Sequence, residues 1–179
     1  MLVVLSDTHS RAGHELAGRT AEAVERADAV VHAGDFTSEA ALDAFHDAAD
    51  RLHAVHGNAD DRDVQERLPP QRTVEYEGVR ILVTHKPEGG ETGLAMRGRE
   101  RGADLVVFGH THRPTFTDTG DVGLLNPGSH ADPRGGPATY AELRVEKGEG
   151  NGGMRGELRR RNGSVLREFA LAAPTEQRG

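Results

Sequence analysis

Five short runs of apolar, mostly β-branched residues lie along this chain, and each run leads into a short polar motif. The runs are Leu2–Leu5, Ala29–Val31, Leu52–Val55, Ile81–Val83 and Leu105–Phe108, and the motifs after them are Asp7-x-His9, Gly34-Asp35, Gly57-Asn58, Thr84-His85 and Gly109-His110-x-His112. Runs of this length and composition predict buried β-strands. In open α/β sheets, side chains converge beyond the carboxyl ends of the strands. The chain is therefore expected to bring five strand ends to one edge.

These motifs contain residue types that bind divalent cations. Carboxylates and neutral imidazoles bind such ions when they are held rigidly at short range, and strand ends hold them better than long loops do. Glycine precedes Asp35, Asn58 and His110, which suits turns that need unusual φ angles or close backbone approach. The sequence contains no cysteine, so oxygen and imidazole are the available ligands.

Length and charge narrow the class of protein. The 179 residues predict one domain over residues 1–172 and a disordered tail over residues 173–179. The chain has neither a run of about 18 apolar residues nor a signal-like leader, so we expect a cytoplasmic protein without membrane contact. The net charge of −7 makes nucleic acid binding unlikely, because such binding needs a basic face. The arginine cluster over Arg155–Arg161 is interpreted as the solvated face of a hairpin.

Helices and hairpins are expected between and after these strands. Helices are predicted at Arg11–Arg26, Ser38–Ala49 with Ser38 as N-cap, Asp60–Arg67 and Glu91–Arg101. Later strands are predicted at Thr73–Tyr76, Val79–Thr84, Thr115–Thr117, Val122–Leu125, Ala138–Val145, Gly156–Arg161 and Val165–Leu171. Glu77-Gly78 and Asn162-Gly163 are typical of hairpin turns, and Lys147–Gly153 is expected to be a mobile loop. This order predicts an α/β (α+β) fold, a four-layer α-β-β-α sandwich of two mixed β-sheets flanked by helices.

The five motifs, in this order and spacing, resemble those of the calcineurin-like metallophosphoesterases. Asn126-Pro127-Gly128-Ser129, followed by Pro133-Arg134, is similar to an extra signature of the small YfcE-type phosphodiesterases. The resemblance extends from residue 1 to about residue 145. It implies a metal-dependent phosphoesterase, most simply a phosphodiesterase (EC 3.1.4.-) acting on small phosphodiesters.

The resemblance also implies a dinuclear metal site. Asp7, His9 and His112 would bind the first ion, Asn58, His85 and His110 the second, and Asp35 would bridge both. A carboxylate suits the bridge because a shared anion offsets the repulsion between two cations about 3.5–4 Å apart. This mixture of imidazole and oxygen ligands suits manganese, our preferred ion, and also Ni, Fe, Co or Zn, better than Mg or Ca. A hydroxide that bridges the two metals would then be the nucleophile.

Catalytic and substrate-binding groups beyond the ligands are less clearly marked. Many members of the superfamily have a histidine after the Gly-Asn pair that protonates the leaving alkoxide, whereas this chain has Ala59 there. This departure predicts a preference for phosphodiesters with good leaving groups. His56 is the alternative acid, although a structural role at the end of its strand is the preferred interpretation. Candidate substrate contacts are Asn58, His85, Lys86, His130 and Arg134, of which Lys86 stands where the family usually has glycine. For Lys86 the preferred interpretation is a lysine on a surface turn, and contact with an anionic substrate is the alternative.

Three functional classes fit the resemblance. The first is the small-substrate phosphodiesterase or, less favoured, a phosphomonoesterase, and we expect it to form a homo-oligomer, either a dimer or a tetramer. The second is a non-catalytic protein-binding scaffold, because the superfamily includes a retromer component with this fold. The third is a nuclease, which the acidic charge balance disfavours. Since no expected ligand is missing from the sequence, the first class is preferred.

Overall fold

The computed structural model describes residues 1–146 and 153–171. The helices are α1 (Arg19–Glu25), α2 (Glu39–Ala48), α3 (Arg62–Arg67) and α4 (Gly90–Glu100). The strands are β1 (Leu2–Leu5), β2 (Ala29–His32), β3 (Leu52–Ala54), β4 (Gln71–Tyr76), β5 (Val79–Thr84), β6 (Leu105–Val107), β7 (Thr115–Asp118), β8 (Gly123–Asn126), β9 (Thr139–Glu146), β10 (Gly153–Arg160) and β11 (Val165–Leu171). Gly153 begins a strand, while the rest of the expected loop, 147–152, and the expected tail, 173–179, lie outside the described residues.

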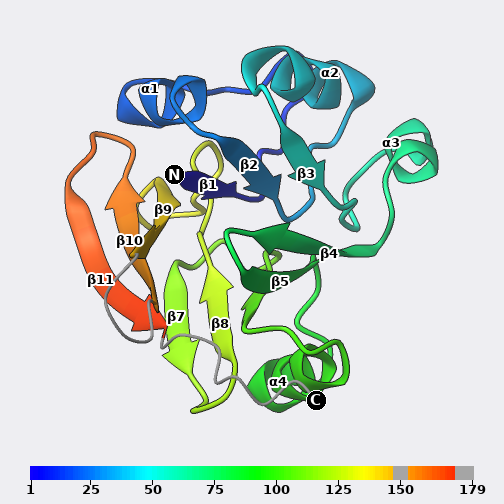
Figure 1. The fold of residues 1–179 in the computed structure, drawn as a ribbon. Coiled ribbons are helices and arrows are strands. Elements are labelled where there is room, and N and C mark those ends of the chain that lie inside the picture. The colour runs from blue at the N-terminus through cyan, green and yellow to red at the C-terminus, as the bar shows by residue number, and fades with distance from the viewer. Residues whose placement is uncertain (147–152, 172–179) are drawn as a thin grey trace.

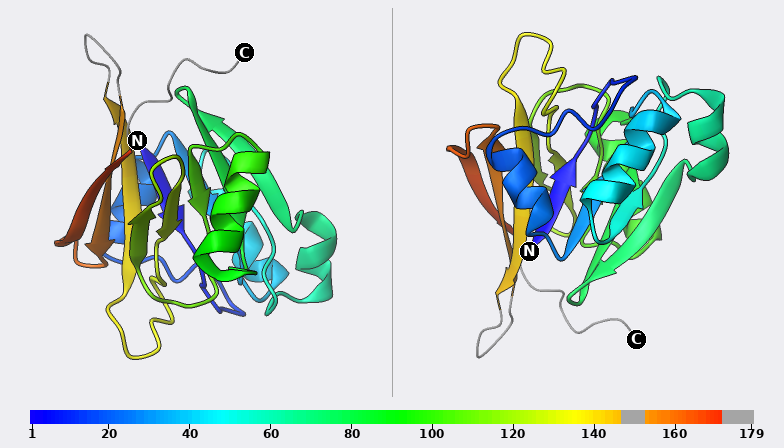
Figure 2. Two further views of the ribbon diagram at one scale, coloured as in Figure 1. Left: turned by 90° about the horizontal axis from the view of Figure 1, so that it is seen from below. Right: turned by 90° about the horizontal axis from the view of Figure 1, so that it is seen from above.

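Two mixed sheets form the centre of the fold. One sheet has the order β11-β10-β9-β1-β2-β3, and the other has the order β4-β5-β6-β8-β7. The first is parallel across β1, β2 and β3, and the second is parallel across β5, β6 and β8. Figure 1 shows α1 and α2 over the outer face of the first sheet and α4 against the outer face of the second. The predicted four-layer α-β-β-α sandwich is confirmed. Figure 2 shows α4 in front of the second sheet when the molecule is seen from below, and α1 and α2 in front of the first sheet when it is seen from above.

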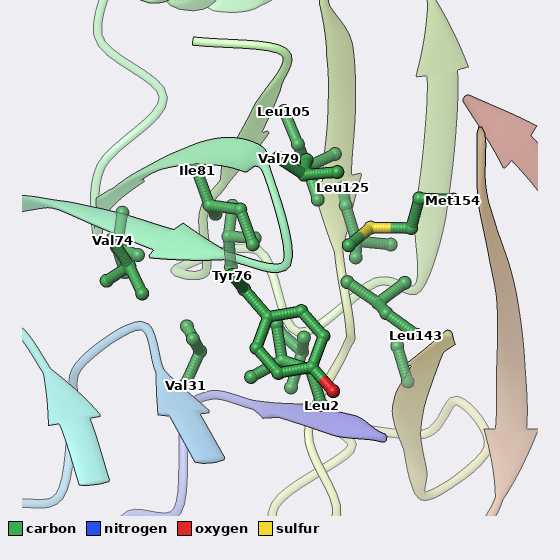
Figure 3. Close-up of a cluster of buried hydrophobic side chains, with 14 of the residues drawn as sticks. Leu2, Val31, Val74, Tyr76, Val79, Ile81, Leu105, Leu125, Leu143 and Met154 are labelled. Carbon is green, nitrogen blue, oxygen red and sulfur yellow. The ribbon is translucent and has the colours of Figure 1, made fainter. Parts of the chain in front are cut away.

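Alternating side chains explain why the strands are buried on both faces. Leu2 and Val4 of β1 point into the core between the sheets, whereas Val3 and Leu5 pack under α1 and α2. In an extended strand, successive side chains point to opposite faces. Figure 3 shows the inter-sheet core, with side chains from both sheets meeting face to face. A third cluster packs the outer face of the second sheet against Leu94 and neighbouring residues of α4.

The first helix is shorter than the sequence suggests. The predicted start at Arg11 is wrong, because α1 begins at Arg19. Gly13 lies in the irregular segment before it, and both Glu15 and Gly18 have left-handed φ angles, of 53° and 57°. Glycine and residues with left-handed φ angles interrupt a helix, so the helix begins only after Gly18.

Both predicted hairpins are present. Glu77 and Gly78 join β4 to β5 with φ angles of 47° and 87°. The connection between β10 and β11 contains Asn162 and Gly163, but only Gly163 has a positive φ. The Asn162 side chain instead accepts a hydrogen bond from the backbone N–H of Ser164, at 3.0 Å. This local side-chain bond is a common alternative way to close a turn.

The predicted convergence of strand ends follows from the parallel pairing. The loops after β1, β2 and β3 leave one edge of the first sheet, and the loops after β5 and β6 leave one edge of the second. The two edges meet, because the His85 ring donates to the Ala33 carbonyl across the gap between the sheets, with Nδ1 at 2.8 Å from the oxygen. Among the described residues, no helix has the length and apolar character needed to cross a membrane.

Candidate metal centre

Five of the seven expected ligands form one compact cluster where the two sheet edges meet. Asp7, His9 and His112 present one ligand atom each, and these atoms lie within 4.8 Å of one another. Asp7, Asp35 and His85 form a second group by the same measure. Asp7, Asp35, His85 and His112 are almost fully buried. Four loops that are far apart in the sequence therefore meet in a polar centre inside the protein.

Asp35 lies between the two groups. Its Oδ2 is 3.2 Å from Nε2 of His85 and 3.3 Å from Nε2 of His9. These two histidines belong to different halves of the site that the resemblance implies. Oδ1 of Asp7 lies 3.2 Å from Nε2 of His112. The centre thus has two carboxylates, each directly opposite at least one imidazole nitrogen.

The imidazole nitrogens that face these carboxylates lack hydrogen-bond partners. Nε2 of His9, His85 and His112 is buried, and none of the three makes a hydrogen bond with good geometry within the described part of the chain. Nδ1 of His85 donates to the Ala33 carbonyl, and Nδ1 of His112 donates to the Asp132 carbonyl. These bonds orient the two rings so that Nε2 points into the cluster and can bind a metal ion, which is the arrangement found in metal-binding histidines. The donor set therefore fits divalent cations.

Interactions within the cluster stabilise the charged forms of Asp7, Asp35 and His9. Burial raises the pKa of Asp7, but His112, His9 and the Ser6 hydroxyl outweigh it and bring this pKa well below its usual range. The pKa of Asp35 is lowered in the same way, because His85 and His9 outweigh its burial. In turn, the Asp35 and Asp7 carboxylates raise the pKa of His9 to about 9. Two ionised carboxylates in a buried site attract cations.

The two remaining expected ligands lie at the rim of the cluster. The ring of His110 contacts the ring of His85 edge-on, with centroids 5.4 Å apart. Burial and the neighbouring His85 lower the pKa of His110, which favours a neutral ring. The backbone N–H of His110 donates to Oδ2 of Asp7 at 3.0 Å. Asn58 is exposed and lines a pocket together with His85.

Backbone strain is concentrated in these loops. Five of the expected ligands have φ angles between 50° and 71°, namely Asp7, His9, Asp35, His110 and His112. Such left-handed conformations are uncommon for residues other than glycine, and they cluster at functional sites. The surrounding structure holds these side chains in orientations that an unstrained loop would not maintain.

Close backbone approach explains two of the glycines. A Cβ on Gly57 would lie 2.0 Å from Oδ1 of Asp35, and a Cβ on Gly109 would lie 2.7 Å from Oδ2 of Asp7. Neither distance is possible for a real side chain. The carboxylates therefore rest directly on the backbone of neighbouring loops, as the positions of the glycines in the sequence predicted.

Asp60 braces the centre, a role that the sequence did not suggest. Its Oδ2 accepts from the backbone N–H groups of Gly57 (2.6 Å) and Asp35 (3.1 Å), and its Oδ1 accepts from that of Thr37 (2.7 Å). We expected Asp60 to begin a helix, but α3 begins at Arg62. Aspartate in a loop often bonds to nearby backbone N–H groups. The feature of the sequence that could have indicated this role is the position of Asp60 directly after Gly57-Asn58-Ala59.

The segment Asn126–Ser129 braces the opposite side. Nδ2 of Asn126 donates to the Gly109 carbonyl and to Oγ1 of Thr111, both at 2.9 Å. Oγ of Ser129 donates to the Asp7 carbonyl at 2.6 Å. Both side chains are fully buried. This motif therefore fixes two of the metal-site loops, although the sequence had suggested only its similarity to a family signature.

The expected substrate contacts occupy different environments. His130 is fully buried, donates from Nε2 to the His14 carbonyl at 2.9 Å and lies against the Phe45 ring, so it has no surface to offer a substrate. Arg134 is exposed, with Nε 3.4 Å from the Asp132 carboxylate. His56 and Lys86 line the same pocket as Asn58 and His85.

His32 lies directly behind the centre. Its Nδ1 accepts from the Gly34 backbone N–H at 3.2 Å, and its Nε2 lies 2.8 Å from Oγ1 of Thr8. The ring stacks on Phe36 with centroids 3.8 Å apart. It therefore supports the backbone before Asp35 and does not contact the carboxylate itself.

Comparisons with known proteins agree with this geometry. Residues 1–148 match the calcineurin-like phosphoesterase superfamily domain. A probable metallophosphoesterase of Methanocaldococcus jannaschii is 36% identical over 152 residues, which cover 82% of this chain and 76% of that protein. The phosphodiesterase YfcE of Escherichia coli is 33% identical over 105 residues, or 55% of each chain.

Solved structures show the same fold. The structure of YfcE from E. coli superposes with a TM-score of 0.67 at 24% identity and covers 95% of this chain and 98% of its own. Vacuolar protein sorting 29 of Cryptosporidium parvum gives a TM-score of 0.77 at 17% identity, covering 96% and 97% of the two chains. At these identities both likenesses concern the fold alone. The chain belongs to the calcineurin-like phosphoesterase superfamily and is a phosphoric ester hydrolase.

Proposed function

We propose that this protein is a metal-dependent phosphodiesterase that hydrolyses small phosphodiesters at a dinuclear centre. The proposed ligands are Asp7, His9, Asp35, Asn58, His85, His110 and His112. The observation that carries the proposal is the position of Asp35, whose Oδ2 lies 3.2 Å from Nε2 of His85 and 3.3 Å from Nε2 of His9. One carboxylate oxygen that faces an imidazole from each half of the site is well placed to be shared by two cations.

The chain's own groups suit two divalent ions. When bound, such ions activate a water as nucleophile and neutralise the charge that develops on the phosphoryl oxygens. Asp7 and Asp35 supply two negative charges, and the histidines supply nitrogen donors, with the rings of His85 and His112 oriented by bonds from Nδ1 to backbone carbonyls. Asn58 adds an uncharged oxygen at the exposed rim. A mixed nitrogen and oxygen set of this kind supports manganese, with Ni, Fe, Co or Zn as alternatives.

The surroundings of the centre favour small diesters. A pocket of about 340 Å³ begins at Asn58 and His85, and pockets of this size suit small ligands. Ala59 stands at the position where a proton donor would assist a poor leaving group. A diester with a good leaving group needs this assistance least. These features together support a diesterase that depends on the leaving group of its substrate.

The test is a matrix of metals and substrates with protein stripped of metal by a chelator. Mn, Ni, Fe, Co and Zn are each added back, and hydrolysis of aryl phosphodiesters and aryl phosphomonoesters is measured side by side. We expect diesters to be cleaved faster than monoesters, with Mn among the activating ions, and no activity before metal is restored. Asp35→Asn should lose this activity while remaining folded. If no ion restores hydrolysis of any ester, the protein-binding scaffold becomes the better account.

A further inference from the structure

The pocket beside the metal centre has features that a site for the phosphate group alone does not need. It extends from His85 and Asn58 toward α3 and α4, where Gln65 and Arg97 contribute to its walls. Its volume of about 340 Å³ leaves room for a group beyond the phosphate. Because the pocket opens at two of the proposed metal ligands, a diester bound at the centre would place one of its substituents there.

Lys86 is the unusual residue of this pocket. It follows His85 directly, its side chain is exposed, and it lines the pocket wall. It is the only lysine in the described part of the chain, and there it forms no ion pair.

The second cation of the pocket is already engaged. Nη2 of Arg97 donates to the Glu88 carbonyl at 2.9 Å, and Nη1 lies 3.7 Å from the Glu88 carboxylate. Arg97 therefore shapes the wall and offsets the charge of Glu88. Of the two cations that line the pocket, Lys86 is the one without an ion pair among residues 1–146 and 153–171, so an anion brought into the pocket would meet its positive charge at the wall.

We propose that this pocket binds a substrate substituent that ends in an anionic group, a carboxylate or a phosphate, and that Lys86 recognises this group. The inference rests on the proposed phosphodiesterase function and specifies its substrate class as diesters that carry a second negative charge. Gln71 of the pocket offers an amide group for the uncharged part of the substituent, whereas Nε2 of Gln65 already donates to the Asp60 carbonyl at 2.7 Å. An ammonium group is a compact cation that binds both carboxylates and phosphates.

The test measures binding, so that it does not depend on catalysis. Two methylphosphinates are compared, one with a 4-carboxybutyl chain and the other with an uncharged pentyl chain. Both mimic the single charge of a diester, and neither has an ester bond to cleave. Their affinities for the metal-loaded protein are measured by calorimetry, with a phosphonobutyl analogue as a third ligand to separate carboxylate from phosphate recognition.

We expect the carboxybutyl or the phosphonobutyl compound to bind about tenfold more tightly than the pentyl compound, the range of a charged hydrogen bond. Lys86→Gln should remove this preference and Lys86→Arg should largely retain it. Arg155→Gln, which removes one positive charge from an exposed site, should leave the preference unchanged. Equal affinities of all three ligands for the unmodified protein would overturn the inference, even if ordinary diesters are hydrolysed. A clear preference without any hydrolysis would support the pocket and contradict the proposed catalytic function.

Discussion

At the scale of single residues, Asp60 shows how a side chain outside the proposed ligand set can determine the geometry of the proposed metal site. It accepts three backbone hydrogen bonds from the loops after β2 and β3. These loops carry Asp35 and Asn58, which are proposed to bind the same ion. Groups that orient metal ligands in this way often matter nearly as much as the ligands themselves.

Asp60→Asn should weaken metal binding. An asparagine has one acceptor oxygen, and its amide group would face a backbone N–H that also donates. We expect metal affinity to fall about 10–100-fold, with a matching loss of activity at limiting metal. Asp61→Asn is the control, because the neighbouring Asp61 carboxylate is exposed and pairs with Arg11. Equal metal affinity of the two variants in a calorimetric titration would show that Asp60 does not position the site.

Ala59 leads to a prediction about leaving groups. Its backbone N–H donates to Oδ1 of Asp35 at 2.8 Å, but its methyl side chain has no proton to give. Because positioned proton transfer contributes roughly 10²–10⁴-fold, we expect aryl phosphodiesters to be cleaved far faster than alkyl phosphodiesters. Ala59→His should narrow this gap and Ala59→Gln should not. Equal rates for alkyl and aryl esters when chemistry limits the reaction would refute the prediction.

Individual residues differed in how well the sequence predicted their place. Asp7, His9, Asp35, His85 and His112 were singled out by their motifs, and the structure brings these five together. His130 was singled out as well, yet its ring is buried against Phe45 and the His14 carbonyl. The position of a side chain in a loop depends on which distant segment packs on it, and the local sequence does not contain that information.

At the scale of elements, the loops at the carboxyl ends of the strands carry the proposed ligands. The loop after β6 passes so close to the loop after β1 that Gly109 lies directly against Ser6 and Asp7. Oδ2 of Asp7 also accepts the backbone N–H of His110 at 3.0 Å. Two strands from different sheets are thus joined at their carboxyl ends through one carboxylate.

Gly109→Ala should disrupt this junction. The added methyl group would lie 2.0 Å from Oγ of Ser6, so the loop or the carboxylate must move. We expect a loss of thermal stability of about 1–3 kcal/mol and a marked loss of metal affinity. Gly13→Ala is the matched control, since a Cβ there meets no atom within 4 Å, and it should be neutral or slightly stabilising. A Gly109→Ala protein with unchanged unfolding temperature and metal affinity would contradict the close packing.

Elements with a clear apolar pattern were predicted best. The bounds of β1, β5 and β11 agree with the strands expected from the sequence, and β2 extends one residue beyond its expected apolar run, to His32. The first helix was overextended, since Gly13 and Gly18 lie in a stretch whose other residues favour helix. Tertiary contacts help to determine where this helix begins. For example, the Arg19 N–H donates to the Arg161 carbonyl at 3.2 Å.

At the scale of the whole molecule, the two sheets and their helices create buried polar positions away from the metal centre. His130 joins the segment before β9 to the segment before α1 through its bond to the His14 carbonyl. Burial lowers the pKa of His130 to about 4. The folded state therefore holds this ring neutral, whereas an unfolded chain would protonate it near pH 6.5.

For this reason the free energy of unfolding should decrease as the pH is lowered. The contribution of neutral His130 is fully present above pH 6.5 and is lost as the pH falls toward 4, because the unfolded state then binds a proton that the folded state does not. We expect a loss of about 2 kcal/mol from this residue between pH 7 and pH 5. Urea unfolding of His130→Gln should show a correspondingly weaker dependence on pH. If the two proteins lose the same free energy of unfolding over this range, His130 is not the source.

The layered architecture itself was predictable from the order of the elements. Strand–helix units followed by hairpins predicted two packed sheets with helices outside, and the structure has this arrangement (Figure 1). The strand orders were not predictable, because β9 returns to pair with β1 over a long separation in sequence. Such pairing depends on the complementarity of distant surfaces, which no short motif records.

The central claim is that two cations share this site, and anomalous X-ray diffraction from a crystal of the Mn-loaded protein tests it most directly. We expect two anomalous peaks about 3.5–4 Å apart, with the Asp35 carboxylate between them, His9 and His112 beside one, and His85 and His110 beside the other. A single peak, or peaks that do not contact Asp35, would contradict the account.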